Sequence, residues 1–425
     1  MQTKKKLESI ILNIKDYVTE LSKWFFLSVF VGVLCGFAGI LFHVSVDEAT
    51  HLREKFPFIL FFLPVAGVII VFLYKICRMD NDKGTNSVFI AVRENEKLSP
   101  FLAPLILIAT TLTHFCGGSA GREGAALQIG GGVASYVARL FRLNDKNTSV
   151  LIMCGMSALF SAVFGTPLTA VIFTLEVIMV GVIHYRVFLP ALIASLSAFG
   201  TAMFFGVEKT SFSIMSVPPL KPQTFLFVAF AAILTALLSI LFIYLMHNCT
   251  HLFSKYIKNK YLRVLTGAII VIILTLLVGN FDYNGAGMNI IRNAVETGSA
   301  SPFAFILKII FTVVTLSVGF KGGEIVPSFF IGSTFGVLIA PLCGLDPSFS
   351  AAICLIAFFC SVVNSPLASL VLSIELFGGE GLLYFAVAVA VSYIISGNHS
   401  LYSAQKIVYS KLHSSFVDER EKSEE

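Results

Sequence analysis

The acidic residue with the clearest potential for chemistry is Glu123, which lies in the glycine-rich segment Gly117–Gly124 just before an apolar run from Ala125. A helix start offers unpaired N–H groups and about half a positive charge, which together bind anions. Glycines let an ion approach those groups closely. A carboxylate there competes with the anion when it is ionised and must leave when it is protonated. Glu123 is therefore predicted to be a gate that couples proton movement to anion movement, and the structural alternative is a helix-capping carboxylate.

Other charged residues lie in similar surroundings. Glu176 and Glu375 each follow a proline by nine residues, near the expected end of a helix. Both are predicted to form hydrogen bonds at a helix end or between the two halves of the chain, and the alternative for Glu176 is a place on a proton path. Lys321 and Glu324 flank a second pair of glycines. They are expected either to pair with each other or to leave Glu324 beside the anion.

Other kinds of chemistry find little support in the sequence. The 8 histidines form no HExxH motif, the 8 cysteines form no CxxC pair, and the glycine-rich segment lacks the GK[ST] ending of a phosphate loop. No metal site and no cofactor are therefore expected. An intramembrane enzyme would need a nucleophile and a base on neighbouring segments, and it stays a remote alternative, as does a pure scaffold. The net charge of +5 comes from basic clusters at segment ends, which set membrane topology and require no nucleic acid.

The elements that position these residues must lie in a membrane. The chain of 425 residues is 56% hydrophobic and 13% charged, whereas a soluble domain has about 25% charged residues. Its mean hydropathy is +0.86. Apolar runs of roughly 15–23 residues are long enough to cross a hydrocarbon core or most of it. These properties predict an all-α integral membrane protein surrounded by membrane lipids.

Many of the apolar segments are interrupted by glycine, proline or polar residues. In a bilayer, irregular backbone survives only where protein or a water-filled cavity satisfies its polar groups. The interruptions therefore indicate a buried site. They lie at Gly117–Gly124, Gly165–Pro167, Lys321–Pro327 and Asn364–Pro366.

The two halves of the chain are similar to each other. Three motifs recur in the same order at offsets of about 203, 202 and 199 residues. The pairs are Gly84–Val88 with Gly287–Ile291, Gly121–Ala125 with Gly323–Pro327, and Phe164–Leu168 with Val363–Leu367. A nearly constant offset predicts an internal repeat, and paired interruptions in the two halves are typical of the substrate site of a transporter.

The repeat leads to a division of the chain into five parts. Residues 1–23 have apolar side chains at helical spacing and are predicted to form an amphipathic helix at the membrane interface. Residues 24–206 and 225–410 form two transmembrane repeats, joined by a polar, proline-bearing linker at 207–224. Residues 411–425 form a short charged tail. The basic N-terminus predicts that the ends of the chain face the cytoplasm at the plasma membrane.

These motifs resemble those of the CLC family of chloride channels and anion/proton antiporters. Gly121–Ala125 (GREGA) resembles the family's GREGP motif, Gly323–Pro327 (GEIVP) resembles GxFxP, and Gly84–Val88 (GTNSV) falls where GSGIP belongs. Ser400–Ala404 (SLYSA) resembles the late segment with the anion-coordinating tyrosine. The resemblance covers about residues 24–410. It implies a homodimer with one pore per subunit, built from inverted repeats of short, tilted and broken transmembrane helices.

The resemblance also implies roles for particular residues. Glu123 would be the external gate and proton acceptor. The anion would be held by Thr85, Tyr402 and the backbone N–H groups near Gly124, Ile325 and Val326. Thr85 replaces the serine of the family motif and carries the same hydroxyl function.

Departures from the family pattern bear on the transported ion and on the coupling to protons. Val177 stands where the family has its inner proton-accepting glutamate, directly after Glu176. Gly322–Pro327 and Ile374–Gly378 look closer to the bacterial fluoride-exporting branch. The expected function is halide/proton antiport of chloride or fluoride. Val177 favours the alternative, a passive chloride channel of the voltage-gated type with the same fold.

Overall fold

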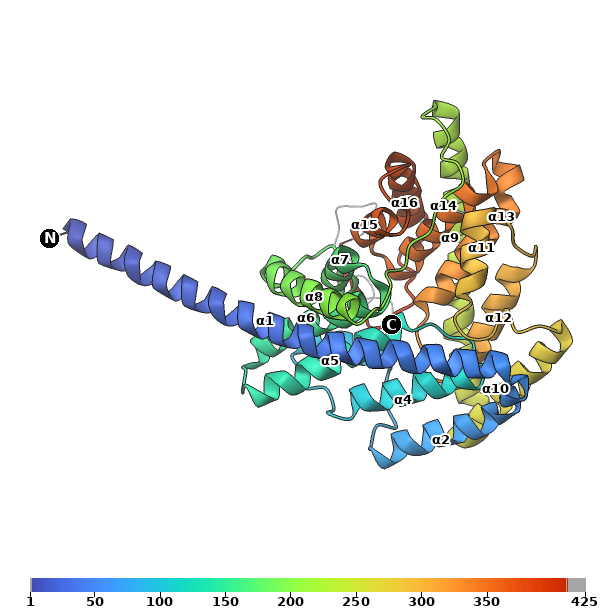
Figure 1. Ribbon diagram of the computed structural model, residues 1–425, viewed down its shortest axis with the longest axis horizontal. Coiled ribbons are helices and arrows are strands. Elements are labelled where there is room, and N and C mark those ends of the chain that lie inside the picture. The colour runs from blue at the N-terminus through green and yellow to red at the C-terminus, as the bar shows by residue number, and fades with distance from the viewer. Residues whose placement is uncertain (1, 410, 412–425) are drawn as a thin grey trace, which may run out of the picture.

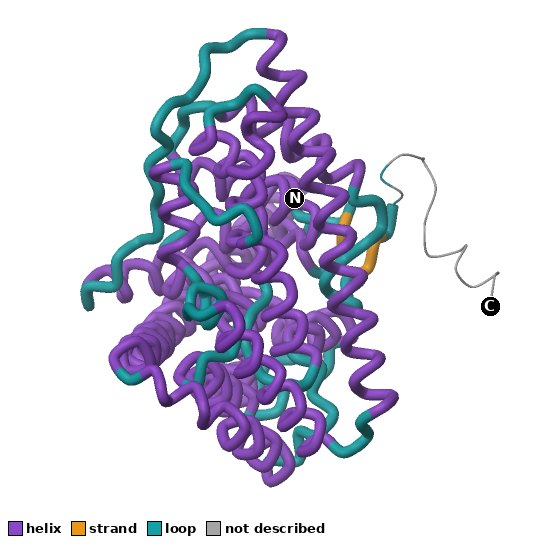
Figure 2. The backbone as a smooth tube through the Cα atoms, turned by 90° about the vertical axis from the view of Figure 1, so that its right-hand side faces the viewer, coloured by secondary structure: helices purple, strands orange, loops and turns teal. Residues whose placement is uncertain are grey.

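The computed structural model describes residues 2–409 and 411, with their side chains from residue 15 onward. The predicted charged tail lies, apart from Lys411, outside the described residues. Most of the described chain is helical, and loops join the helices (Figure 2). Its elements are α1 (Gln2–Lys55), the 3-10 helix η1 (Pro57–Phe62), α2 (Leu63–Ile76), α3 (Thr85–Glu94), α4 (Leu102–Phe115), α5 (Glu123–Leu140), α6 (Asp145–Phe164), α7 (Pro167–Val177), β1 (Met179–Val180), α8 (Tyr185–Phe204), α9 (Pro222–Tyr256), α10 (Lys260–Val278), α11 (Met288–Thr297), α12 (Ala304–Ser317), α13 (Ile325–Cys343), α14 (Pro347–Val363), α15 (Pro366–Phe377), α16 (Leu382–Ile395) and β2 (Lys406–Ile407).

The helices form two sets that follow the same order, α1 to α8 and α9 to α16 (Figure 1). Equivalent helices pack in equivalent ways: α5 packs on α6 as α13 packs on α14, α4 on α5 as α12 on α13, and α1 on α8 as α9 on α16. The matched sequence motifs all fall at helix starts, those of α3 and α11, α5 and α13, and α7 and α15. The predicted all-α fold and internal repeat are therefore confirmed.

Glycines let the central helices approach each other closely. A Cβ atom on Gly130 would lie 2.1 Å from the carbonyl oxygen of Gly155, and one on Gly336 would lie 2.5 Å from that of Ser350. These contacts join α5 to α6 and α13 to α14, the equivalent pairs of the two halves. Such close approach of backbones is typical of helix packing in membranes. The starts of α5 and α13 are thus carried by tightly packed helix pairs.

Seven helical segments of the described chain are long and apolar enough to cross a membrane. They are Lys15–Lys55, Pro57–Ile76, Asp145–Phe164, Tyr185–Phe204, Pro222–Tyr256, Lys260–Val278 and Ile325–Cys343. The apolar helices α4, α7, α12, α14, α15 and α16 are shorter, at 10–17 residues. Within its most apolar window α6 is 94% buried, whereas α10 is 28% buried. α6 therefore lies inside the protein and α10 at its periphery, as expected for a multi-pass fold.

The expected boundary between an interfacial helix at residues 1–23 and a first span is absent. α1 runs without a break from Gln2 to Lys55 and reaches away from the other helices in Figure 1. No glycine or proline precedes Gly32, so nothing in the sequence ends the helix near residue 23. The side chains of residues 15–23 are exposed, and packing begins at Trp24. The linker between the halves occupies residues 205–221, because α9 begins at Pro222.

Candidate functional site

Glu123 begins helix α5 and is buried, with 1% of its surface exposed. Its Oε2 accepts a hydrogen bond from the backbone N–H of Arg122 at 3.0 Å. Its Oε1 is buried and has no hydrogen-bond partner. The carboxylate thus folds back on the start of its own helix, where the first N–H groups have no partners within the helix. Glu123 stands where the sequence places it, and its role as a gate stays a prediction.

The starts of α5 and α13 are joined directly. Gly121 and Gly323 exchange two backbone hydrogen bonds, at 2.7 and 2.8 Å, in an antiparallel bridge. A Cβ atom on Gly323 would lie 2.5 Å from the backbone nitrogen of Gly124, so a larger residue does not fit there. Gly124, Ile325 and Val326 are all buried near this junction. Two positive helix ends therefore meet inside the protein, where they favour negative charge.

A cavity of about 510 Å³, here called the Tyr402 cavity, lies beside this junction. Its lining includes Thr85, Gln128, Glu324 and Tyr402. The hydroxyl of Tyr402 is buried without a hydrogen-bond partner, and its ring packs edge-on against Phe89 with the centroids 5.0 Å apart. The Oε2 of Glu324 also lacks a partner, and a Cβ atom on Gly124 would lie 3.0 Å from it. The structure thus brings Thr85, Glu324 and Tyr402 together next to the start of α5.

Gln128 joins this group although no sequence motif singles it out. Its Nε2 donates to the hydroxyl of Thr85 and to the carbonyl oxygen of Gly124, both at 3.3 Å. The Thr85 hydroxyl in turn lies 3.4 Å from the same carbonyl oxygen. Gln128 therefore donates to the oxygen of Thr85, while the Thr85 hydroxyl donates to Gly124 and would have to turn from that carbonyl oxygen to reach an anion. The available signal was a glutamine one helical turn after Gly124, inside an apolar run.

A second cavity of about 370 Å³, here called the Arg122 cavity, is lined by Arg53, His114 and Arg122 among others. The guanidinium of Arg122 lies 2.8 Å from Nδ1 of His43, and that of Arg53 donates to the carbonyl oxygen of His114 at 2.8 Å. Glu123 lines neither cavity. Arg122, which precedes Glu123, lines the Arg122 cavity. Glu324, which lies close to Gly124, lines the Tyr402 cavity. Glu123 is therefore buried next to residues that line each of the two cavities.

Glu176 and Glu375 cap each other's helices. The carboxylate of Glu176 accepts hydrogen bonds from the backbone N–H groups of Leu367 and Ala368, at 3.1 and 2.9 Å. The carboxylate of Glu375 accepts from those of Leu168 and Thr169, at 2.9 and 2.8 Å. The predicted hydrogen bonding between the halves is confirmed. Neither residue lines the Tyr402 cavity.

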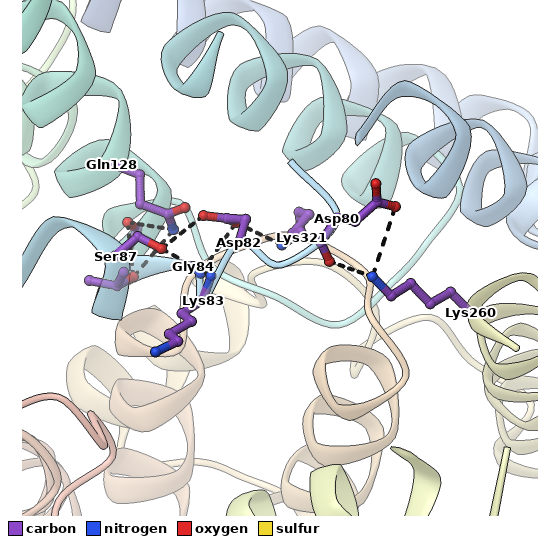
Figure 3. A network of polar contacts seen from close by, with 10 residues as sticks. Asp80, Asp82, Lys83, Gly84, Ser87, Gln128, Lys260 and Lys321 are labelled. Atoms are coloured by element: carbon purple, nitrogen blue, oxygen red, sulfur yellow. Dashed lines mark hydrogen bonds and ion pairs between the residues drawn. The ribbon is translucent and has the colours of Figure 1, made fainter. Parts of the chain in front are cut away.

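Lys321 does not pair with Glu324, which corrects one of the two expected arrangements. Its ammonium instead lies 3.0 Å from Oδ2 of Asp82, in the loop before α3 (Figure 3). Glu324 is left lining the cavity, and its place beside an anion stays a prediction. Asp82 is 239 residues away in the chain, so no local spacing could reveal this partner.

A buried lysine is a further feature that the motifs do not reveal. Lys308 on α12 is fully buried, and its ammonium donates to the carbonyl oxygens of Tyr283 and Gly285 at 3.2 and 2.7 Å. A single lysine in the apolar helix Ala304–Ser317 was the visible signal. Within the described residues, no group of three or more His, Cys, Asp or Glu side chains could hold a metal ion.

Comparison with known proteins extends this picture. The sequence model of a family described as voltage gated chloride channel matches residues 65–397. A chloride/fluoride channel protein of Pseudomonas syringae pv. tomato is 34% identical over 411 residues, which make up 95% of this chain and 91% of that protein.

Solved structures agree with that match. A CLC-type fluoride/proton antiporter is 33% identical and superimposes with a TM-score of 0.88, covering 92% of this chain and 99% of that one. A slow cyanobacterial Cl⁻/H⁺ antiporter shares the fold, with a TM-score of 0.76 at 18% identity, over 88% of this chain and 94% of that one. The predicted architecture is confirmed at the level of the whole chain.

Proposed function

The chain belongs to the voltage-gated chloride channel (CLC) family of anion transport proteins, and from that premise we propose that it exchanges fluoride for protons, with Glu123 as the gate. The observation that carries this proposal is the placement of the Glu123 carboxylate. It is buried at the joined starts of α5 and α13, where Arg122 lines one cavity and Glu324 lines the other. An anion and this carboxylate compete for the same N–H groups, so one must leave before the other enters.

The proposed cycle uses the two states of one carboxyl group. Ionised Glu123 occupies the helix starts and closes the path between the cavities. Protonation removes the charge that held it there, so the side chain swings away and an anion takes its place. Release of the proton on the other side returns the carboxylate. Anion and proton movement are thereby coupled in opposite directions, because each occupies the site in turn.

The anion site consists of donors that line or adjoin the Tyr402 cavity. We assign to it the Tyr402 hydroxyl, which is buried without a partner, and the Thr85 hydroxyl, which Gln128 holds. Backbone N–H groups near Gly124, Ile325 and Val326 complete it. The preference for fluoride rests on two relatives above 30% identity whose descriptions include fluoride. Glu324 sits beside this site and is the second carboxyl group available to a proton.

The assembly is proposed to be a homodimer with one pore per subunit, in the plasma membrane. Membrane lipids cover the exposed apolar side chains of the outer helices, such as Leu277, which is 78% exposed. The N- and C-termini are placed in the cytoplasm because of the basic residues that precede the first span.

A passive channel is the second candidate, and Val177 is the observation that favours it. This residue is fully buried, and its carbonyl oxygen accepts a hydrogen bond from Gln405 at 2.8 Å. It therefore offers no proton acceptor at the position where the family carries its inner glutamate. The relative from Pseudomonas syringae pv. tomato is also described as a channel protein.

Vesicle flux separates the two candidates. In liposomes that contain the protein, an imposed fluoride gradient is expected to drive protons against their own gradient. Glu123→Gln should abolish this proton movement, whereas the control Glu296→Gln, which only removes a surface ion pair with Arg292 at 3.2 Å, should leave it intact. Fluoride flux through the wild-type protein without proton movement would establish the channel instead. Chloride flux as fast as fluoride flux would overturn the assigned ion.

A further inference from the structure

An ion pair between Asp82 and Lys321 joins one repeat to the other (Figure 3). The Lys321 ammonium lies 3.0 Å from Oδ2 of Asp82, and the two side chains are 19% and 2% exposed. Both residues line the Tyr402 cavity. A second pair nearby, Lys260 with Asp80, is 3.9 Å apart and 39% and 43% exposed. The Asp82–Lys321 pair is therefore largely shielded from solvent, whereas the Asp80–Lys260 pair is an ordinary surface pair.

Asp82 organises the turn that begins α3. Its Oδ2 also accepts a hydrogen bond from the backbone N–H of Gly84 at 3.2 Å, and its Oδ1 accepts from the hydroxyl of Ser87 at 3.0 Å. Gly84 has a φ of +64°, a conformation that suits glycine. Thr85 follows directly. The position of the Thr85 hydroxyl at the anion site thus depends on the carboxylate of Asp82.

Lys321, in the second repeat, is fixed by contacts with the first repeat. Its ammonium lies 4.4 Å from the centre of the Tyr74 ring, so a cation–π contact on α2 adds to the ion pair. The chain then runs through Gly323, which bonds to Gly121, to Glu324 at the start of α13. Lys321 therefore anchors the loop that carries Glu324 onto the first repeat.

The same end of the first repeat also holds the segment of Tyr402. The amide oxygen of Asn86 accepts a hydrogen bond from the backbone N–H of Ala404 at 2.9 Å, and Arg93 donates to the carbonyl oxygen of Ala404 at 2.6 Å. Phe89 packs against the Tyr402 ring. The turn at Asp82 thus lies at the point where three segments that line the anion site are tied together.

We propose that Asp82 and Lys321 form a latch that fixes the distance between the Thr85 and Glu324 segments and thereby keeps anion movement tied to proton movement. With the latch intact, the site stays narrow enough for the anion and the Glu123 carboxylate to exclude each other. Without it, the two loops separate and anions pass while the carboxylate remains in place. The two residues are positioning residues, and the inference rests on the proposed exchange of fluoride for protons.

The test compares variants of the two neighbouring ion pairs in the same liposomes. Lys321→Met and Asp82→Asn each remove one latch charge and keep the side-chain size, while Lys260→Met removes the surface pair as a matched control. Fluoride and proton fluxes are measured together, which yields the number of protons moved per fluoride. This ratio does not depend on how much protein is folded. Fluoride affinity is measured by isothermal titration. Lys321→Arg tests whether a different side chain with the same positive charge keeps the wild-type behaviour.

The latch predicts that both latch variants lower the proton-to-fluoride ratio and weaken fluoride binding by about fivefold, the scale expected for neighbouring coupled groups. Lys321→Arg should restore the ratio, and Lys260→Met should match the wild type. A wild-type ratio and affinity in Lys321→Met and Asp82→Asn would overturn the latch. If the wild-type protein itself moves no protons, the proposed exchange fails, and fluoride affinity in the same variants still decides whether the latch holds the site.

Discussion

At the scale of single residues, several described hydroxyls are buried without a partner, and among them only that of Tyr402 belongs to a residue that lines the Tyr402 cavity. A buried unpaired hydroxyl costs free energy, and such a cost is typical of a group that waits for a ligand. Tyr384 is a buried tyrosine whose hydroxyl has a structural role. That residue is equally buried, but its hydroxyl donates to the carbonyl oxygen of Pro219 at 2.7 Å.

The two tyrosines therefore predict opposite results for the same substitution. Tyr402→Phe keeps the ring against Phe89 and removes only the unpaired hydroxyl, so fluoride affinity is expected to fall about tenfold while thermal stability stays the same or rises. Tyr384→Phe should lower stability by about 1 kcal/mol and leave affinity unchanged. Isothermal titration and thermal melts of both purified variants measure this. Unchanged affinity in a stable Tyr402→Phe would remove this residue from the anion site.

Residues of the site differ in how visible they are in the sequence. Glu123, Glu324 and Tyr402 stand in motifs with glycine or with a characteristic neighbour. The structure places Glu324 and Tyr402 at one cavity and Glu123 at the adjoining start of α5. Gln128 and Asp82 carry no such mark. Each acts on an atom that another segment supplies, and the identity of that segment follows only from how the loops meet in the fold.

At the scale of elements, α7 and α15 are related by their reciprocal caps. Each helix begins with a proline, which suits the first turn, and receives a glutamate carboxylate from near the end of the other helix. The carboxylate also interacts favourably with the positive end of the helix that it caps. The pair therefore joins the two repeats at a second place, separate from the bridge between Gly121 and Gly323.

Substitution of either capping glutamate is predicted to cost stability and leave coupling unchanged. Glu176→Gln and Glu375→Gln each lose a charged acceptor, at a cost of about 1 kcal/mol. The loss should be larger for Glu176, which is 7% exposed. Thermal melts and the proton-to-fluoride ratio test this together. Loss of proton movement in Glu176→Gln alone would instead place this residue on the proton path.

Helix starts were easier to predict than helix lengths. Glycine and proline mark the starts of α5, α7, α13 and α15, because they permit a turn there or fit the first turn. The amphipathic spacing predicts a separate helix at residues 1–23, whereas α1 is continuous because no residue near position 23 ends a helix. A change in side-chain polarity along a helix indicates where the surroundings of the helix change. The helix itself can continue through that point.

At the scale of the whole molecule, the repeat explains why a site exists at the centre. Two similar halves supply two helix starts, and the bridge between Gly121 and Gly323 brings these positive ends together in the interior. The offsets along the chain predicted that such pairs exist. How the halves face each other could not be read from the offsets, because the contacts between them join residues about two hundred positions apart.

Helix α1 is longer than a membrane span requires. Its 54 residues would span about 80 Å at about 1.5 Å per residue, whereas a hydrocarbon core is about 30 Å thick. The side chains of residues 15–23 are exposed, and burial begins with Trp24 and Leu27. The first part of α1 therefore lies beyond the packed helices, in agreement with its direction in Figure 1.

Two truncations test this division of α1. A chain without residues 2–19 is expected to keep its melting temperature and its fluoride flux, because Glu20, which accepts a hydrogen bond from the Trp24 indole at 2.9 Å, is retained. A chain without residues 2–27 also loses the buried side chains of Trp24 and Leu27, and each should cost about 1.5–3 kcal/mol. Thermal melts and size-exclusion chromatography compare both with the full chain. If the shorter truncation already lowers the melting temperature or splits the proposed dimer, the first turns of α1 pack against a second copy of the chain rather than lie along the lipid surface.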